Sequence, residues 1–128
     1  MKTYLSEYIG TTFLLMIVVG SGIMGQSLSD NASLTLLANT ISTGAGLIVL
    51  IWMFGNISGA HFNPAVSIVM FANGELNPKT FIFYSLFQIL GAISGTLITI
   101  LIEPSIIVNQ TWLVVLLISP FLFLYKRK

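Results

Sequence analysis

The stretch that decides the fold is Gly55-Asn56-Ile57-Ser58-Gly59-Ala60-His61-Phe62-Asn63-Pro64, a glycine-rich polar run inside residues 31–74, which carry no charged side chain. Before it, Leu34–Phe54 is long enough for a helix that crosses a bilayer, which needs about 20 residues. After it, Ala65–Ala72 makes only about two helical turns and cannot cross. An irregular loop that faces lipid would leave its N–H and C=O groups without partners. The sequence therefore predicts a re-entrant element over residues 55–72, in which a packed loop enters the membrane and a half-helix returns to the same side.

The residue types at the two ends of this half-helix are those that begin and end helices. Asparagine is a favoured N-cap, so Asn63 is expected just before the first turn, and Pro64 suits the first helical position because it lacks an N–H. Gly74 is placed as the helix stop. The start of a re-entrant helix lies near the membrane midplane, where its dipole repels cations and the asparagine amide can donate to a solute oxygen. Acceptors along the same path would come from the carbonyl groups of Gly59, Ala60 and His61.

Composition indicates a polytopic membrane protein. The chain has 128 residues, of which 55% are hydrophobic and 7% are charged, whereas a soluble domain carries about a quarter charged residues. This excludes an ordinary soluble enzyme, a nucleic-acid binder that uses basic patches, and a disordered tail. There is no cysteine, and the sequence shows no nucleophile–base set, phosphate loop or metal cluster. We therefore expect no enzyme activity, no cofactor and no metal.

The charge-free segments predict an all-α membrane protein. Expected spanning helices cover about residues 4–25, 34–54 and 79–102, and a shorter fourth run, Trp112–Tyr125, is interrupted by Pro120. With four crossings, every lysine and arginine would face the cytoplasm, in keeping with the positive-inside rule. These residues are Lys2, Lys79 and the tail Lys126, Arg127 and Lys128.

Three features each allow a structural and a functional interpretation. Glu7 is either an ordinary interfacial residue or a buried functional carboxylate, because charge inside a span is costly. The single histidine, His61, either packs the loop or gates a path. Gly91 and Gly95 form a G-x-x-x-G pattern that permits close helix approach, or they are spaced so by chance.

At this point the residues resemble a known family. The run Ser58-Gly59-Ala60-His61-Phe62-Asn63-Pro64-Ala65-Val66 closely resembles the first signature of the aquaporin, or major intrinsic protein, family. Two further matches lie in the first and third expected helices: Glu7 with Gly10-Thr11, and Gln88 with Gly91-Ala92. The resemblance covers about residues 4–101. It implies three spanning helices, with one half-helix between the second and the third.

The resemblance also implies roles for individual residues. Asn63, in the motif Asn63-Pro64-Ala65, would be the pore asparagine, and Glu7 would brace the loop. Thr43 would lie at the constriction, where water-selective members tend to carry an aromatic ring, so that a threonine would widen the filter. The pore-lining carbonyl groups would be those of Gly59, Ala60, His61 and Phe62. The runs 19–25 and 37–40 also resemble a bacterial branch that is associated with arsenite and other metalloid hydroxides.

One departure from the family is large. Its members consist of two inverted tandem halves with a second N-P-A and a nearby arginine, whereas this sequence has one N-P-A and a single arginine, Arg127. Residues 104–128 form a divergent segment that does not resemble the second half. The hypothesis is therefore a half-pore in the inner membrane for water, glycerol or metalloid hydroxides. This half-pore would need an oligomer or a complementary second-half chain to conduct, and it would bind no nucleic acid. Two alternatives remain: a truncated, non-conducting membrane protein, and a four-helix multidrug-type transporter, which would lack its mid-span carboxylate.

Overall fold

The computed structural model describes the backbone of residues 1–106 and the side chains of residues 1–102. These residues form four helices and no strand: α1 (Lys2–Leu28), α2 (Ala32–Ser58), α3 (Pro64–Ala72) and α4 (Pro78–Ile106). The expected fourth run, Trp112–Tyr125, and most of the divergent segment lie outside the described residues.

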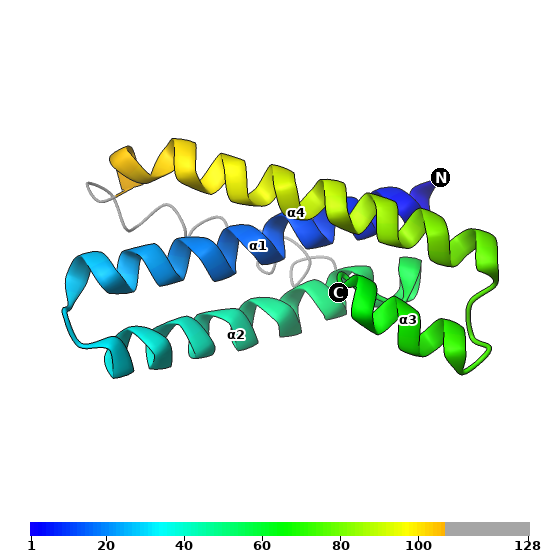
Figure 1. The fold of residues 1–128 in the computed structure, drawn as a ribbon, viewed down its shortest axis with the longest axis horizontal. Helices are drawn as coiled ribbons and strands as arrows, with labels where there is room; N and C mark the ends of the chain where they lie inside the picture. Colours follow the sequence, from blue (N-terminus) through cyan, green and yellow to red (C-terminus); the bar gives the residue numbers. More distant parts are fainter. Residues whose placement is uncertain (107–128) are drawn as a thin grey trace, which may run out of the picture.

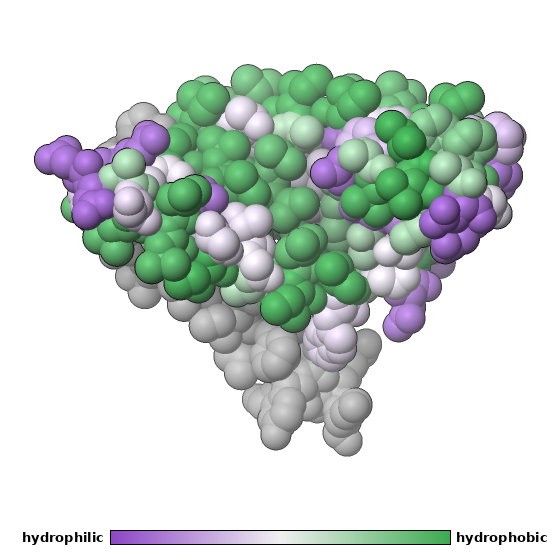
Figure 2. Space-filling view, turned by 60° about the horizontal axis from the view of Figure 1, so that its bottom comes forward, coloured by the Kyte–Doolittle hydropathy of each residue, from purple (hydrophilic) through white to green (hydrophobic). Residues whose placement is uncertain are grey.

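Three of the helices can each cross a membrane. By length and composition, α1, α2 and α4 qualify, and the nine-residue α3 is too short. On the face shown in Figure 2, apolar residues cover most of the middle and hydrophilic residues gather toward the two ends. These observations confirm the predicted class, an all-α membrane protein with three spanning helices and one half-helix.

The end of α2 differs from the expected position. The sequence placed the end of the second spanning helix at Phe54, but the helix continues to Ser58. Gly59 then takes the left-handed conformation, with φ 87°, and its N–H donates to the carbonyl oxygen of Gly55 over 3.0 Å. The polar residues Asn56 and Ser58 therefore belong to the last turn of the helix, and a glycine C-cap ends it.

The long helices lie side by side, with α1 between α2 and α4 (Figure 1). Glycines allow the close approach of α4 to α1, since a Cβ on Gly91 would lie 2.5 Å from the carbonyl oxygen of Tyr8, and one on Gly95 would collide with that of Thr12. The G-x-x-x-G pattern is thus a packing seam. Against α2, the amide nitrogen of Asn39 donates to the carbonyl oxygen of Val18 over 2.7 Å.

Helix α3 re-enters the bundle. It begins partway along the long helices and runs back toward the end at which α4 starts (Figure 1). It packs against α4, where the rings of Phe71 and Phe81 stack with centroids 5.0 Å apart. Gly74, with φ 78°, follows the C-cap Asn73 and donates its N–H to the carbonyl oxygen of Phe71 over 3.0 Å. The half-helix therefore ends where the sequence predicts.

Candidate pore-lining site

The loop between α2 and α3 has an unusual backbone. Besides Gly59, two residues with side chains take left-handed angles: Ala60 with φ 53° and Phe62 with φ 50°. Residues other than glycine rarely adopt this conformation, and each such residue costs about 1–3 kcal/mol. The loop therefore needs strong contacts elsewhere to hold it in this shape.

The carboxylate of Glu7 supplies these contacts. Glu7 lies on α1 with 0% of its surface exposed. Its Oε1 accepts hydrogen bonds from the hydroxyl of Ser58 at 2.5 Å and the backbone N–H of His61 at 3.1 Å. Its Oε2 accepts from the backbone N–H of Phe62 at 2.7 Å and the side-chain nitrogen of Gln88 at 2.8 Å. Hydrogen bonds to a carboxylate are roughly twice as strong as neutral ones, so this residue joins α1, the loop and α4.

Two side chains of α4, one turn apart, complete the support of the loop. The hydroxyl of Tyr84 donates to the carbonyl oxygen of Ser58 over 2.6 Å. The side-chain nitrogen of Gln88 also donates to the hydroxyl oxygen of Ser67 on α3 over 3.0 Å. That oxygen lies 3.1 Å from Nδ1 of His61. Gln88 and Ser67 are fully buried, so the loop, the half-helix and α4 share one enclosed polar network.

The ring of Phe62 anchors the loop on its apolar side. It is buried and packs edge-on against Phe54, with centroids 5.9 Å apart. It occupies the space above Gly10 of α1, where an added Cβ would collide with the ring. The glycine in the first helix thus makes room for the loop.

Asn63 lies exposed at the start of α3. Its side-chain oxygen accepts the N–H of Ala65 over 2.8 Å, and Pro64 occupies the first turn, as the sequence predicts. Because the cap bond uses the oxygen, the amide NH₂ is the group that remains for a partner. Asn63 and Pro64 line a cleft of about 420 Å³ whose other walls come from α1 and α4, including Leu14 and Ile93. The half-helix therefore presents a donor to a mostly apolar hollow.

Thr43 lies apart from this network. It belongs to α2, and its side chain is partly exposed. Its hydroxyl oxygen is buried, and within residues 1–102 it has no hydrogen-bond partner. The structure therefore brings Glu7 together with the loop residues and the start of α3, whereas Thr43 makes no hydrogen bond to them.

Sequence reasoning overlooked two residues of the network, Ser67 and Tyr84. Ser67 is the one polar side chain of α3, which could have identified it. Tyr84 lies in a helix with several other polar side chains, so no signal in the sequence distinguishes it. Ser67 lies one turn after Asn63, and Tyr84 lies one turn before Gln88, which belongs to the family resemblance in the third spanning helix.

Comparison with known families decides the identity of this fold. The family described as major intrinsic protein matches residues 1–118, which is most of the chain. The chain belongs to the major intrinsic protein family. The match extends beyond the stretch, about residues 4–101, on which the sequence resemblance rests.

Individual relatives are aquaporins from several kingdoms. The chain is 50% identical over 91 residues to aquaglyceroporin AqpS of Rhizobium meliloti, which covers 71% of this chain and 39% of the relative. It is 37% identical over 101 residues to a probable aquaporin TIP2-2 of Oryza sativa, covering 77% and 41%. It is 29% identical over 108 residues to aquaporin-4 of Mus musculus, covering 84% and 33%. The chain thus spans well under half the length of these relatives.

Membership of the major intrinsic protein family groups the chain with relatives that are named aquaporin or aquaglyceroporin. It agrees with the three apolar helices that are long enough to cross a bilayer.

Proposed function

We propose that the chain is a half-pore of an aquaporin-type channel for small neutral solutes. The observation that carries the proposal is Asn63, which caps α3 with its oxygen and presents its amide NH₂ at the cleft between α1 and α4. The positive end of the α3 dipole lies at the same point, so that a solute oxygen is attracted and a cation is repelled.

Around this donor, the loop supplies acceptors. Irregular backbone within a membrane has to line a cavity or be packed in protein. Because Ala60 and Phe62 have left-handed angles, the carbonyl groups of the loop lie outside the helical hydrogen-bond pattern. In the proposal, the carbonyl groups of Gly59, Ala60, His61 and Phe62 line the path, and Glu7 is the brace that fixes them. Thr43 forms the constriction, where a small side chain admits glycerol-sized solutes.

The described residues contribute one half-helix, and the proposed pore needs a second one that meets it from the opposite face. In the proposal, the second half-helix meets the start of α3 beside the cleft that Asn63 and Pro64 line. A complementary second-half chain, or an oligomer, provides it in the bilayer. The AqpS name favours water and glycerol as solutes, and metalloid hydroxides share their small size and hydroxyl groups.

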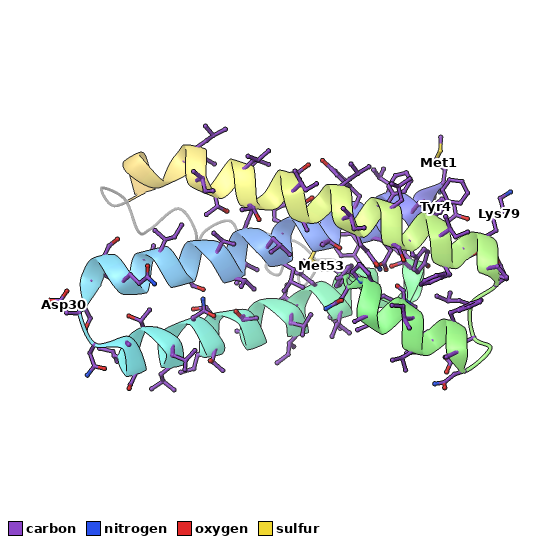
Figure 3. All side chains as sticks on the ribbon, viewed as in Figure 1. Met1, Tyr4, Asp30, Met53 and Lys79 are labelled. Atoms are coloured by element: carbon purple, nitrogen blue, oxygen red, sulfur yellow. The ribbon has the colours of Figure 1, made fainter. Side chains whose placement is uncertain are left out.

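The positions of the charged residues favour one orientation. Met1 and Lys79 lie at one end of the bundle, and Asp30 lies at the other (Figure 3). The positive-inside rule then puts the N-terminus and the α3–α4 connection in the cytoplasm, with the basic tail on the same side, in an inner membrane.

Liposome flux tests the proposal. The full chain is reconstituted alone and together with a polypeptide that carries the second half of AqpS, and stopped-flow light scattering follows water and glycerol entry. We expect little flux from the chain alone and clear flux from the pair. Strong flux from the chain alone would contradict the need for a separate second-half chain and would favour an oligomer of this chain.

A chimera supplies the control for failed pairing. In it, the matching 91 residues of this chain replace the corresponding part of AqpS. If neither the pair nor a correctly inserted chimera conducts, the channel proposal is wrong, and the chain is a non-conducting membrane protein.

A further inference from the structure

A second cleft lies between α1 and α2, at the end of the bundle opposite to the α3–α4 connection. Asp30, in the α1–α2 turn, marks this end in Figure 3. The volume of the cleft is about 640 Å³, which is within the usual range for ligand pockets, about 300–1,000 Å³. The polar side chains that line it are Gln26, Ser29, Asp30, Thr35 and Asn39. All of them carry oxygen atoms and none is basic, so acceptor oxygens predominate in the lining.

Contacts with α1 fix the orientation of the Asn39 amide. Its nitrogen lies 2.7 Å from the carbonyl oxygen of Val18, which only accepts, so the NH₂ group and not the oxygen faces α1. The same nitrogen donates to the hydroxyl oxygen of Ser21 over 3.3 Å, and that hydroxyl donates to the carbonyl oxygen of Ile17 over 2.6 Å. Gly22 leaves room for this contact, since a Cβ there would lie 3.1 Å from the amide nitrogen. Within the described helices, Oδ1 of Asn39 is therefore an acceptor without a partner.

Two threonines flank Asn39 on the same face of α2. Thr35 lies one turn before it and Thr43 one turn after it. A threonine in a helix commonly bonds the carbonyl group one turn earlier, as Thr12 and Thr40 do here. The hydroxyl oxygens of Thr35 and Thr43 are buried and have no partner within the described residues. Three consecutive turns of α2 thus each carry a polar oxygen without a partner, from the cleft to the proposed constriction.

The lining of the cleft suits a neutral solute with several hydroxyl groups. Such a solute can donate to Oδ1 of Asn39 while its other oxygens accept from neighbouring groups such as the Gln26 amide or the Ser29 hydroxyl. A metal ion is a poorer fit, since residues 1–102 contain no group of three histidine, cysteine, aspartate or glutamate side chains that could hold one. The carboxylate of Asp30, which is exposed, disfavours an anion.

We propose that Asn39 is a specificity-determining residue whose Oδ1, oriented by Val18 and Ser21, accepts a hydrogen bond from a small neutral polyol in the cleft between α1 and α2. The site is separate from the cleft at the start of α3, with which it shares no lining residue. A polyol is favoured over a solute with one hydroxyl because it can pair with Oδ1 and with the Gln26 amide at the same time. Only the passage of the bound polyol toward Thr43, one turn away, rests on the channel function proposed above.

Asparagine NMR tests binding without a flux measurement. In the 128 residues, Asn39 is the only asparagine followed by threonine, and Asn56 the only one followed by isoleucine. Labelling with ¹³C-asparagine and either ¹⁵N-threonine or ¹⁵N-isoleucine therefore identifies each signal without a substitution. For the full chain in lipid nanodiscs, glycerol should shift the Cγ resonance of Asn39 and leave that of Asn56 in place, and 1-propanol should shift Asn39 less. An Asn39 resonance that ignores glycerol, or responds instead to sodium or calcium chloride, would overturn the proposal.

A pair of leucine variants tests the specificity role in the chimera with AqpS. Asn39→Leu keeps the approximate size of the side chain but removes Oδ1, and Asn56→Leu is the matched control in the last turn of the same helix. The glycerol-to-water flux ratio should fall about fivefold in Asn39→Leu, as for the loss of one hydrogen bond between neutral groups, and stay unchanged in the control. Equal ratios in the two variants would overturn the specificity role, and the wild-type titration decides binding even if Asn39→Leu fails to fold.

The two experiments separate the binding site from the channel. A glycerol response at Asn39 in a chain and a chimera that never conduct would contradict the channel and leave the binding site standing. A conducting chimera in which Asn39 ignores glycerol would do the reverse.

Discussion

The side-chain nitrogen of Gln88 donates to Oε2 of Glu7 over 2.8 Å and joins residues that are 81 positions apart. The same carboxylate accepts the backbone N–H groups of His61 and Phe62. One buried residue near the start of the chain thus connects the re-entrant loop to the third spanning helix.

Replacement of Glu7 by glutamine should destabilise the fold. The amide keeps the size of the side chain, but its NH₂ would face groups that donate, leaving at least one of the four buried donors unpaired. We expect a loss of about 2–4 kcal/mol in the free energy of unfolding, measured by titration with SDS in mixed micelles and circular dichroism. Glu75→Gln, in the exposed α3–α4 connection, is the control and should lie within about 0.5 kcal/mol of the wild type. Equal stability of the two variants would contradict the brace.

Gly91→Ala should separate α4 from α1. The new Cβ would lie 2.5 Å from the carbonyl oxygen of Tyr8, and backbone cannot move aside cheaply. We expect a loss of about 1–3 kcal/mol in the same titration. Gly44→Ala is the matched control, because an added Cβ there meets nothing within 4 Å and alanine favours the helix. If both variants behave alike, the glycine seam contributes nothing to packing.

Asn63→Asp should lower solute flux without loss of the half-helix. Aspartate is as good an N-cap as asparagine, so α3 should persist. A carboxylate deep in the membrane costs about 2.5–3.5 kcal/mol and lacks the amide donor, so flux through the chain paired with its second half should fall on the order of tenfold or more. Asn73→Asp, at the other end of α3, controls for the added charge. Unchanged permeability at equal insertion would remove Asn63 from the pore.

Thr43→Phe should narrow the proposed constriction. An aromatic ring blocks the larger solute first, so glycerol flux should fall more than water flux in the paired liposomes. Thr40→Phe, at an exposed position one turn earlier on α2, adds the same ring elsewhere. An unchanged glycerol-to-water ratio in Thr43→Phe would show that this position does not line the filter.

Single cysteines should report one fixed orientation. The chain has no cysteine of its own, so Asp30→Cys and Glu75→Cys each introduce one unique thiol, at the α1–α2 turn and the α3–α4 connection. In intact spheroplasts, a membrane-impermeant maleimide should label Asp30→Cys readily and Glu75→Cys only after lysis. Labelling of both before lysis would indicate chains inserted in both orientations, and an inverted homodimer would then be the functional unit.

The architecture could be predicted because its determinants are local. The uncharged residues 31–74 contain one run that is long enough to span and one that is not, and Asn63-Pro64 is a strong helix start. These features depend on residue type and neighbours in the chain, and they predicted α3 and the three spans.

The shape of the loop could not be predicted in this way. Ala60 and Phe62 have no intrinsic preference for left-handed angles, and they adopt them because Glu7, from another helix, binds the N–H groups of His61 and Phe62. The partners of Ser67 likewise depend on where α4 places Gln88. The position of Thr43 at the constriction was inferred only from its spacing to the family signature. Within residues 1–102 its hydroxyl has no hydrogen-bond partner.

The bonds to Glu7 also set an order of events while the chain is being made. Glu7 leaves the ribosome well ahead of the loop, and Gln88 follows later still, 81 positions behind it. Helices α1 and α2 can enter the membrane as a hairpin, but the carboxylate lacks one of its four donors, the Gln88 amide, until α4 arrives. The re-entrant segment therefore gains its full set of bonds only after the third spanning helix has been inserted, and a chain arrested before Tyr84 would hold its loop without the bonds from Tyr84 and Gln88.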